Sequence, residues 1–165
     1  EDYPWFALHR PRDQKIFEAS QKIIVPYRAK KNIFGYTSNP VYSSRDVFYI
    51  TPKSESLNIK YILALLNSKT FYLWYYHKGK RKGDTLELYA TPLSETPIKV
   101  ISENEQNKFI ELVDLIINIK NSDDYHDNLN KQNKYKAIQS KIDWLIYQLY
   151  KFTPEEIKII EDAYK

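Results

Sequence analysis

Residues 22–36 read KIIVPYRAKKNIFGY, and they contain a strong β-strand signal followed at once by a polar stretch. The signal is the run Ile23, Ile24 and Val25, which Pro26 stops. A short apolar run that ends at a proline is typical of a buried strand, because proline cannot donate a hydrogen bond to a sheet. The polar stretch that follows alternates basic with aromatic residues. We therefore expect a buried strand that leads directly into a cationic surface segment.

Further strands are expected on the C-terminal side of this stretch. Residues 46–51 (DVFYIT) form a second strong strand signal, which Pro52 stops. The composition of residues 37–40 (TSNP) predicts a turn between the two strands. Residues 86–89 and 97–101 are expected to form two more short strands. Together these segments predict a mixed sheet in the first hundred residues.

One helix is expected between the second strand and the third. Asn58 can cap a helix that begins at Ile59, and apolar residues keep helical spacing from there to Leu73. The polar pair at residues 67–68 can break this helix, which should end towards Gly79.

The last third of the chain is expected to be helical. Helices are expected at about residues 103–119, 135–150 and 154–164, and a polar segment rich in Asn, Asp and Lys, near residues 119–134, reads as a linker. Capping signals open two of them: Ser102 with Glu105, and Thr153 with Pro154 and Glu156. The sequence therefore predicts an α/β (α+β) domain over residues 1–101, built on a mixed sheet, and a helical tail over residues 102–165.

Composition limits the classes of protein that remain. The 165 residues include no cysteine, which excludes disulfide scaffolds and thiolate zinc sites and suits a reducing cytosol. The longest apolar run, residues 61–66, is far too short to span a bilayer, so no membrane association is expected. The chain also has no methionine, even at position 1, and we expect it to be part of a larger protein.

Positive charge is concentrated in the first half of the chain. The formal net charge is only +4, but residues 22–82 hold twelve Lys and Arg residues against Asp46 and Glu55. Such a block can attract a polyanion, although a lysine-rich solvated surface explains it equally simply. Charge alone therefore leaves nucleic-acid binding and an ordinary surface both open.

No catalytic or cofactor constellation stands out. His9, His77 and His126 have no helically spaced partner that could complete a metal site. The glycines at 79 and 83 are not followed by the Gly-Lys-Ser/Thr of a phosphate-binding loop. We expect no catalytic residue, no metal and no bound cofactor in this chain.

Binding signals are stronger than catalytic ones. Three segments combine basic residues with aromatic or polar ones: residues 26–36, 42–46 and 74–83. Arginines suit base edges because of their bidentate geometry, whereas lysines suit phosphates. The candidate DNA-binding residues are Arg28, Lys30, Lys31, Tyr36, Arg45, Lys78, Lys80, Arg81 and Lys82.

The order of several segments resembles one known family. Residues 22–28 (KIIVPYR), 44–51 (SRDVFYIT), 61–69 (YILALLNSK) and 79–83 (GKRKG) resemble the TaqI-like C-terminal specificity domain. Residues 86–89, 92–98 and the tail at 142–157 (IDWLIYQLYKFTPEEI) fit the same pattern in the same order. The resemblance covers nearly the whole chain.

This resemblance implies a role in a restriction-modification system. In such proteins an N-terminal domain methylates adenine N6 with S-adenosylmethionine, and some also carry a Mg-dependent endonuclease. The C-terminal domain is similar to the target-recognition domains of type I specificity subunits and reads the DNA sequence. The resemblance thus implies double-stranded DNA as the partner, a methyltransferase domain outside this chain, no catalysis by the chain itself and a prokaryotic cytoplasm.

Other readings remain open. A protein-docking or structural module would use the aromatic helix at residues 71–76 and the C-terminal helices to pack against a parent domain. The Glu156-Ile157-Lys158 triplet has the spacing of some Mg-dependent nucleases, but it follows a helix cap, where such a triplet is ordinary surface. Single-stranded RNA would suit the many aromatics through stacking.

Overall fold

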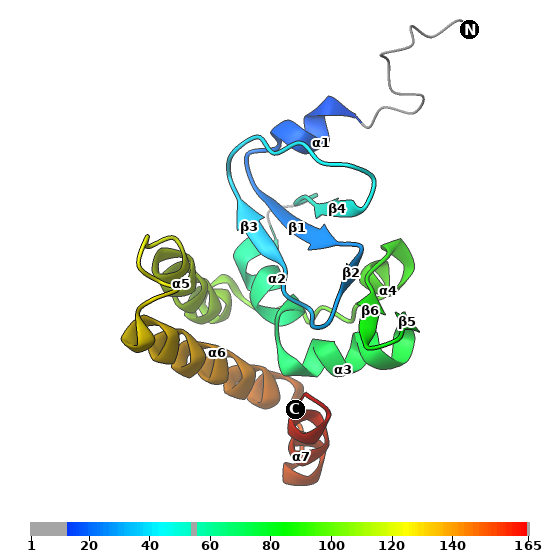
Figure 1. Ribbon diagram of the computed structural model, residues 1–165. Coiled ribbons are helices and arrows are strands. Elements are labelled where there is room, and N and C mark those ends of the chain that lie inside the picture. The colour runs from blue at the N-terminus through cyan, green and yellow to red at the C-terminus, as the bar shows by residue number, and fades with distance from the viewer. Residues whose placement is uncertain (1–12, 54–55, 165) are drawn as a thin grey trace, which may run out of the picture.

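The structure, a computed structural model, describes residues 13–53 and 56–164 (Figure 1). Strands and helices are interspersed up to β6 and only helices follow in the described chain, which confirms the expected α+β class. His9 lies outside the described residues. The helices are α1 (Gln14–Glu18), α2 (Ile59–Leu66), α3 (Lys69–Lys78), α4 (Ala90–Ser94), α5 (Glu103–Lys120), α6 (Leu129–Tyr150) and α7 (Pro154–Ala163). The strands are β1 (Lys22–Pro26), β2 (Arg28–Ala29), β3 (Gly35–Thr37), β4 (Val47–Ile50), β5 (Lys80–Lys82) and β6 (Thr85–Glu87).

The first of two three-stranded antiparallel sheets, here called sheet A, is built around β1 in the order β3-β1-β4. Ile23 and Val25 of β1 are fully buried, so the strand predicted at residues 22–26 is confirmed, as is the strand β4. Lys22 is also fully buried, and its Nζ donates to the carbonyl oxygens of Ala19 (2.9 Å) and Asn39 (2.7 Å). A buried ammonium needs such acceptors to offset its lost hydration. Lys22 therefore ties the end of α1 to the turn before residue 40.

The second sheet, here called sheet B, has the order β2-β6-β5 and is also antiparallel. The described strands thus form two antiparallel sheets and not the mixed sheet that was expected. The cationic segment at residues 79–83 carries no apolar strand signal and would be expected to form a loop, but β5 occupies most of it. Gly83 has φ of +62°, which glycine adopts without strain, and this allows the tight return from β5 into β6. The short strand expected at residues 86–89 is present as β6, which begins one residue earlier and already ends at Glu87.

The strand expected at residues 97–101 does not form. Side chains rather than a neighbouring strand take the polar backbone groups of this segment. The Tyr61 hydroxyl donates to the Lys99 carbonyl (2.7 Å), and the Tyr150 hydroxyl donates to the Pro97 carbonyl (2.7 Å). The segment therefore packs as an extended connection between α4 and α5.

The predicted helix break at residues 67–68 is confirmed and forms the α2–α3 junction. The Asn67 side chain pairs with Phe34 in both directions: Oδ1 accepts from the Phe34 N–H (2.7 Å), and Nδ2 donates to the Phe34 carbonyl (3.0 Å). The buried Asn32 amide donates to the carbonyls of Leu66 (2.6 Å) and Ser68 (2.9 Å). These two amides fix the segment before β3 against the point where the helices meet.

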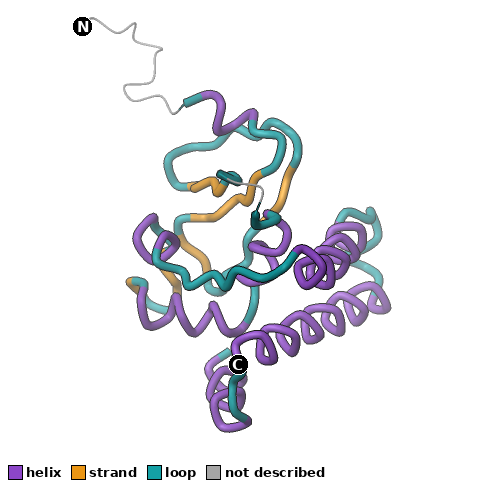
Figure 2. The backbone as a smooth tube through the Cα atoms, turned by 180° about the vertical axis from the view of Figure 1, so that it is seen from behind, coloured by secondary structure: helices purple, strands orange, loops and turns teal. Residues whose placement is uncertain are grey.

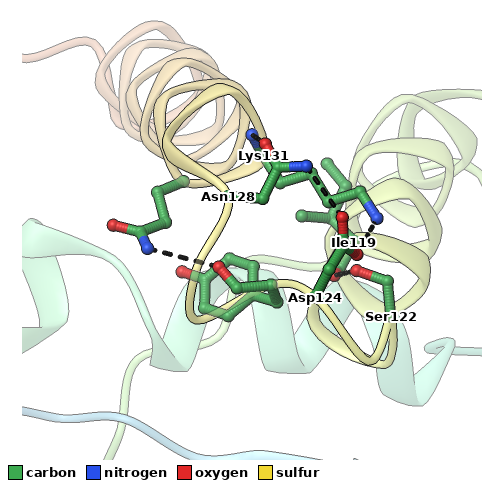
Figure 3. Close-up of polar contacts among 7 residues, drawn as sticks. Ile119, Ser122, Asp124, Asn128 and Lys131 are labelled. Carbon is green, nitrogen blue, oxygen red and sulfur yellow. Dashed lines mark hydrogen bonds and ion pairs between the residues drawn. The ribbon is translucent and has the colours of Figure 1, made fainter.

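The C-terminal helices include one correction. Both predicted capping boxes are present, at Ser102 and Thr153. However, α6 begins at Leu129, well before residue 135, so the polar linker is shorter than expected. Asn128 caps α6, and Asp124 in the preceding loop forms an ion pair with Lys131 (Figure 3). The hydrogen bond from Lys131 is the main reason that the pKa of Asp124 falls to about 2.

One hydrophobic cluster joins the sheets to the helices. It contains Ile23 of β1, Leu65 of α2, Leu112 of α5 and Ile146 of α6, among others. Helices α5 and α6 lie side by side next to α2, as Figure 2 shows from behind. Residues from both sides of position 101 therefore share a single core.

Replacement of Asn67 by alanine should destabilise the fold strongly. The change leaves the N–H and carbonyl of Phe34 without their side-chain partners in a half-buried position. We expect the free energy of unfolding, measured by urea denaturation, to fall by about 2–4 kcal/mol. Asn133→Ala on the exposed face of α6 is the matched control and should change it by less than about 0.5 kcal/mol. Equal stabilities of the two variants would contradict this role of Asn67.

Asp143 of α6 is a buried carboxyl at the start of α3. Its Oδ1 accepts from the backbone N–H of Lys69 (3.0 Å), while Oδ2 has no hydrogen-bond partner among the described residues. Nearby, Lys69 pairs with Glu161 of α7 (2.5 Å), and Tyr147 donates to the same carboxylate (2.8 Å). Burial raises the pKa of Asp143 to about 6, although the Lys69 N–H opposes the shift.

Asp143→Asn should therefore stabilise the protein at neutral and alkaline pH. The folded-state pKa lies above the ordinary value of about 4, so the native state holds this proton more tightly than the unfolded state. Stability is thus lost as the pH rises from about 4 to about 6, by up to about 3 kcal/mol. The asparagine keeps the acceptor for Lys69 and lacks this loss. Urea denaturation at pH 4.5 and pH 8 checks this: the free energy of unfolding of Asp143→Asn should exceed that of wild type by more at pH 8 than at pH 4.5. The exposed Asp123→Asn is the control, and an equal difference at both pH values would contradict the prediction.

Candidate nucleic-acid interface

Sheet B gathers several of the predicted DNA-binding residues. Its register places Arg28 of β2 opposite Glu87 of β6, and Glu87 opposite Lys80 of β5. Because side chains alternate along a strand, Lys82 leaves β5 on the same face as Lys80. This face therefore carries three cations, Arg28, Lys80 and Lys82, around the single carboxylate of Glu87.

Arg81 leaves β5 on the opposite face. Its register partner Leu86 is 2% exposed, so this face of sheet B is the one that packs onto the protein. Arg81 itself is exposed, and its guanidinium carbon lies 4.0 Å from the ring centroid of Tyr76 in α3. Because side chains alternate along a strand, cations project from both faces of β5, which is the edge strand of sheet B.

Arg28 is the most strongly paired of the candidates. Its Nη2 and Nε donate to one carboxylate oxygen of Glu87 at 2.7 and 3.0 Å. This hydrogen bond raises the pKa of the Arg28 guanidinium above its ordinary value. The Tyr27 ring lies below the same group, at 5.0 Å. The side chain is held in place, but much of its charge is neutralised.

Lys30 and Lys31 differ in their surroundings although they are adjacent. Lys30 is exposed and pairs with Asp84 in the β5–β6 turn (3.0 Å), and this hydrogen bond lowers the pKa of Asp84. Lys31 instead donates to the Tyr164 carbonyl (2.9 Å) and lies 3.8 Å from the Tyr164 ring centroid. Lys30 therefore belongs with sheet B, whereas Lys31 holds the end of α7.

The remaining candidates lie in other places. Tyr36 is in β3 of sheet A and lines a cavity of about 320 Å³ between β3, α2, α5 and α6. Arg45 is exposed in the turn that precedes β4, a strand of sheet A. Lys78 ends α3, 5.4 Å from the Trp74 ring centroid, where a cation also suits the helix dipole. The structure thus places Arg28, Lys80 and Lys82 on one face of sheet B, Arg81 on the other face, and Lys30 beside the β5–β6 turn.

Sequence reasoning missed the residues that orient these cations. Glu87, Asp84 and Tyr76 each contact one of the candidate side chains. The alternation of Thr85, Leu86 and Glu87 was a signal for the partner strand. Had it been combined with residues 80–82 as a hairpin, it would have placed Glu87 opposite Lys80.

A separate groove of about 780 Å³ lies between α3 and α7. Its walls are mostly apolar and include Leu73 and Trp74 of α3, Phe152, and Ile159 of α7. It is formed by the aromatic helix and the C-terminal helices that a protein-docking module would use.

Neither a metal-binding cluster nor a membrane-spanning helix is found among the described residues. Residues 13–53 and 56–164 contain no group of three or more His, Cys, Asp or Glu side chains that could hold a metal ion. Within the same ranges, no helix is long and apolar enough to cross a membrane.

Comparison with known proteins places this chain in a family. The model of the TaqI-like C-terminal specificity domain matches residues 5–98, more than half of the chain. The chain is 29% identical over 142 residues to the type II methyltransferase M.MjaIV of Methanocaldococcus jannaschii, covering 82% of this chain and 47% of that protein. It is 32% identical over 99 residues to the type II methyltransferase M.HincII of Haemophilus influenzae, covering 58% of this chain and 19% of that protein. The chain thus spans less than half the length of these relatives, and it belongs to the family of TaqI-like C-terminal specificity domains.

Proposed function

We propose that this chain recognises the DNA target sequence of a restriction-modification enzyme. The observation that carries the proposal is the cationic sheet B in a chain whose family is that of specificity domains. Strand β2 pairs with β6 only at Leu86 and Glu87, so the tip of the β5–β6 hairpin, from Lys82 to Thr85, is two strands wide. The major groove of B-DNA admits a two-stranded ribbon.

The two faces of β5 would have different roles, one in phosphate contacts and the other in base contacts. Lys80 and Lys82 are exposed on one face, where they suit phosphates, which position a protein on the duplex without reading its sequence. Arg81 is exposed on the other face, and a guanidinium can donate two hydrogen bonds to a base edge. Lys30, which pairs with Asp84 in the hairpin turn, would add a phosphate contact.

The parent protein would carry the chemistry. Because the relatives are type II methyltransferases and extend beyond the matched part, we infer a methyltransferase domain outside this chain. That domain would transfer a methyl group from S-adenosylmethionine to adenine N6 of an extruded base. An endonuclease with bound Mg would complete a restriction enzyme if the parent also cleaves. The chain would supply recognition rather than catalysis, in the cytoplasm of a prokaryote.

Loss of the three β5 cations should weaken binding to every duplex. For the Lys80→Gln/Arg81→Gln/Lys82→Gln variant, we expect lower affinity at low salt. The dependence of log K on log salt should flatten by up to about 0.9 for each lost phosphate contact. Fluorescence anisotropy with a randomised duplex pool at two salt concentrations measures both quantities.

The matched control removes the same positive charge from α6. Lys134, Lys136 and Lys141 are exposed there, and their triple glutamine variant should bind duplex nearly as well as wild type. If both triple variants lose affinity equally, the effect is one of net charge and the assignment of sheet B fails.

Glu87→Gln should strengthen binding to duplex DNA. The change removes the carboxylate that lies between Arg28 and Lys80 in sheet B and frees the guanidinium of Arg28. We expect affinity at low salt to rise by about two- to fivefold, as for the loss of one partly exposed repulsive charge. The exposed Glu111→Gln on α5 removes the same charge and should have a smaller effect. Weaker binding of Glu87→Gln would instead show that Glu87 itself contacts DNA.

The protein-docking alternative makes the opposite prediction for wild type. A docking module would bind a protein partner and show no appreciable affinity for duplex DNA even at low salt. A preference for single strands over duplex in the same assay would favour the RNA alternative.

A further inference from the structure

We propose that Tyr76 is a positioning residue for Arg81, and that Arg81 rather than Arg28 reads a base edge. This inference rests on the proposed function and names the part of sheet B that gives sequence preference. The chemistry it selects is a base with two adjacent acceptors in the major groove, which is guanine through O6 and N7.

The chain path between α3 and β5 brings Arg81 back over Tyr76. The turn is made at Gly79, where a Cβ atom would lie only 2.7 Å from the Tyr75 carbonyl oxygen. Glycine is therefore required for this close approach. Two residues later, Arg81 leaves the strand on the face that also carries the buried Leu86, which is directed towards the protein. Its guanidinium carbon comes to 4.0 Å from the Tyr76 ring centroid.

The stacked arrangement suits base recognition. A guanidinium that lies over an aromatic ring is held through one flat face, while its N–H donors point outward in the plane. Fewer side-chain conformations are then lost when the base binds, which favours affinity and selectivity. The Tyr76 ring is itself contacted by Tyr72 (6.1 Å between centroids) and His77 (5.2 Å), so its position is supported from within α3.

Arg28 is the less suitable reader. Its Nε and Nη2 are already donated to Glu87, so a base would have to compete with an adjacent carboxylate. Within the part of the chain that the structure describes, no carboxylate forms an ion pair with Arg81. Arg81 thus combines a position over the Tyr76 ring with a charge that is not offset by an ion pair, whereas the charge of Arg28 is offset by Glu87.

The experiment selects preferred sequences from a randomised duplex pool with wild type and four variants, and sequences the bound fraction. Arg81→Lys keeps the charge but loses the planar fork, and Tyr76→Leu removes the ring beneath it. We expect both to lose roughly 5- to 100-fold of the preference for guanine at one position, which is the usual range for one bidentate pair. Their affinity for a scrambled duplex, and its salt dependence, should stay close to wild type because the charge is unchanged.

The other two variants separate positioning from mere structure. Tyr76→Phe keeps the ring and should keep the preference, whereas Arg28→Lys should leave the selected sequence unchanged. A retained preference in Arg81→Lys, or its loss in Arg28→Lys, would overturn the inference while leaving DNA recognition intact. If wild type binds no duplex, or binds without any preferred sequence, the proposed function fails instead. Circular dichroism of Tyr76→Leu checks its fold, and Arg81→Lys, at an exposed position, tests the inference independently of it.

Discussion

The α2–α3 junction is the constraint on which the rest of the structure depends. Two asparagine side chains, Asn32 and Asn67, replace the hydrogen bonds that a strand or a continuous helix would otherwise supply at this point. They join the segment that follows β2 to the break between the two helices. Because β1, β2 and β3 are consecutive in the chain, this one attachment sets where both sheets lie relative to the helices. The N–H of Lys69, bound by Asp143, extends the same junction to α6.

Sheet B follows from that junction through α3. The direction of α3 is fixed at its start by Ser68 and Asp143, and its end delivers the chain to Gly79 and β5. The position of the cationic edge is therefore set by a helix that is buried through Phe71 and Tyr75, each 1% exposed. The candidate interface is thus placed by helices and strands rather than by a free loop, and a rigid support favours defined contacts with a ligand.

Much of this architecture could be predicted from the sequence, and the parts that could not share a physical cause. The strands at β1 and β4, the break at Asn67 and the two capping boxes depend on local signals, and the structure confirms each of them. Strand β5 has no local strand signal because all three of its residues, Lys80, Arg81 and Lys82, are charged. It is a strand only because it pairs with β6. Residues 97–101 have a local strand signal but do not form a strand, because the hydroxyls of Tyr61 and Tyr150, from helices distant in sequence, hydrogen-bond to backbone carbonyls of this segment.

The candidate site shows the same division between local and distant information. Residue type and local charge indicated which cations to consider, and five of them lie on sheet B or beside its β5–β6 turn. The pairing of Arg28 with Glu87, 59 positions away, and the contact of Lys31 with Tyr164 depend on tertiary structure and have no local signal.

The open edge of β5 has one more consequence. An unpaired strand edge is a template for unwanted association with another chain, and charged side chains are a common protection against it. The cations of β5 therefore protect this edge from adding a strand of a neighbouring molecule.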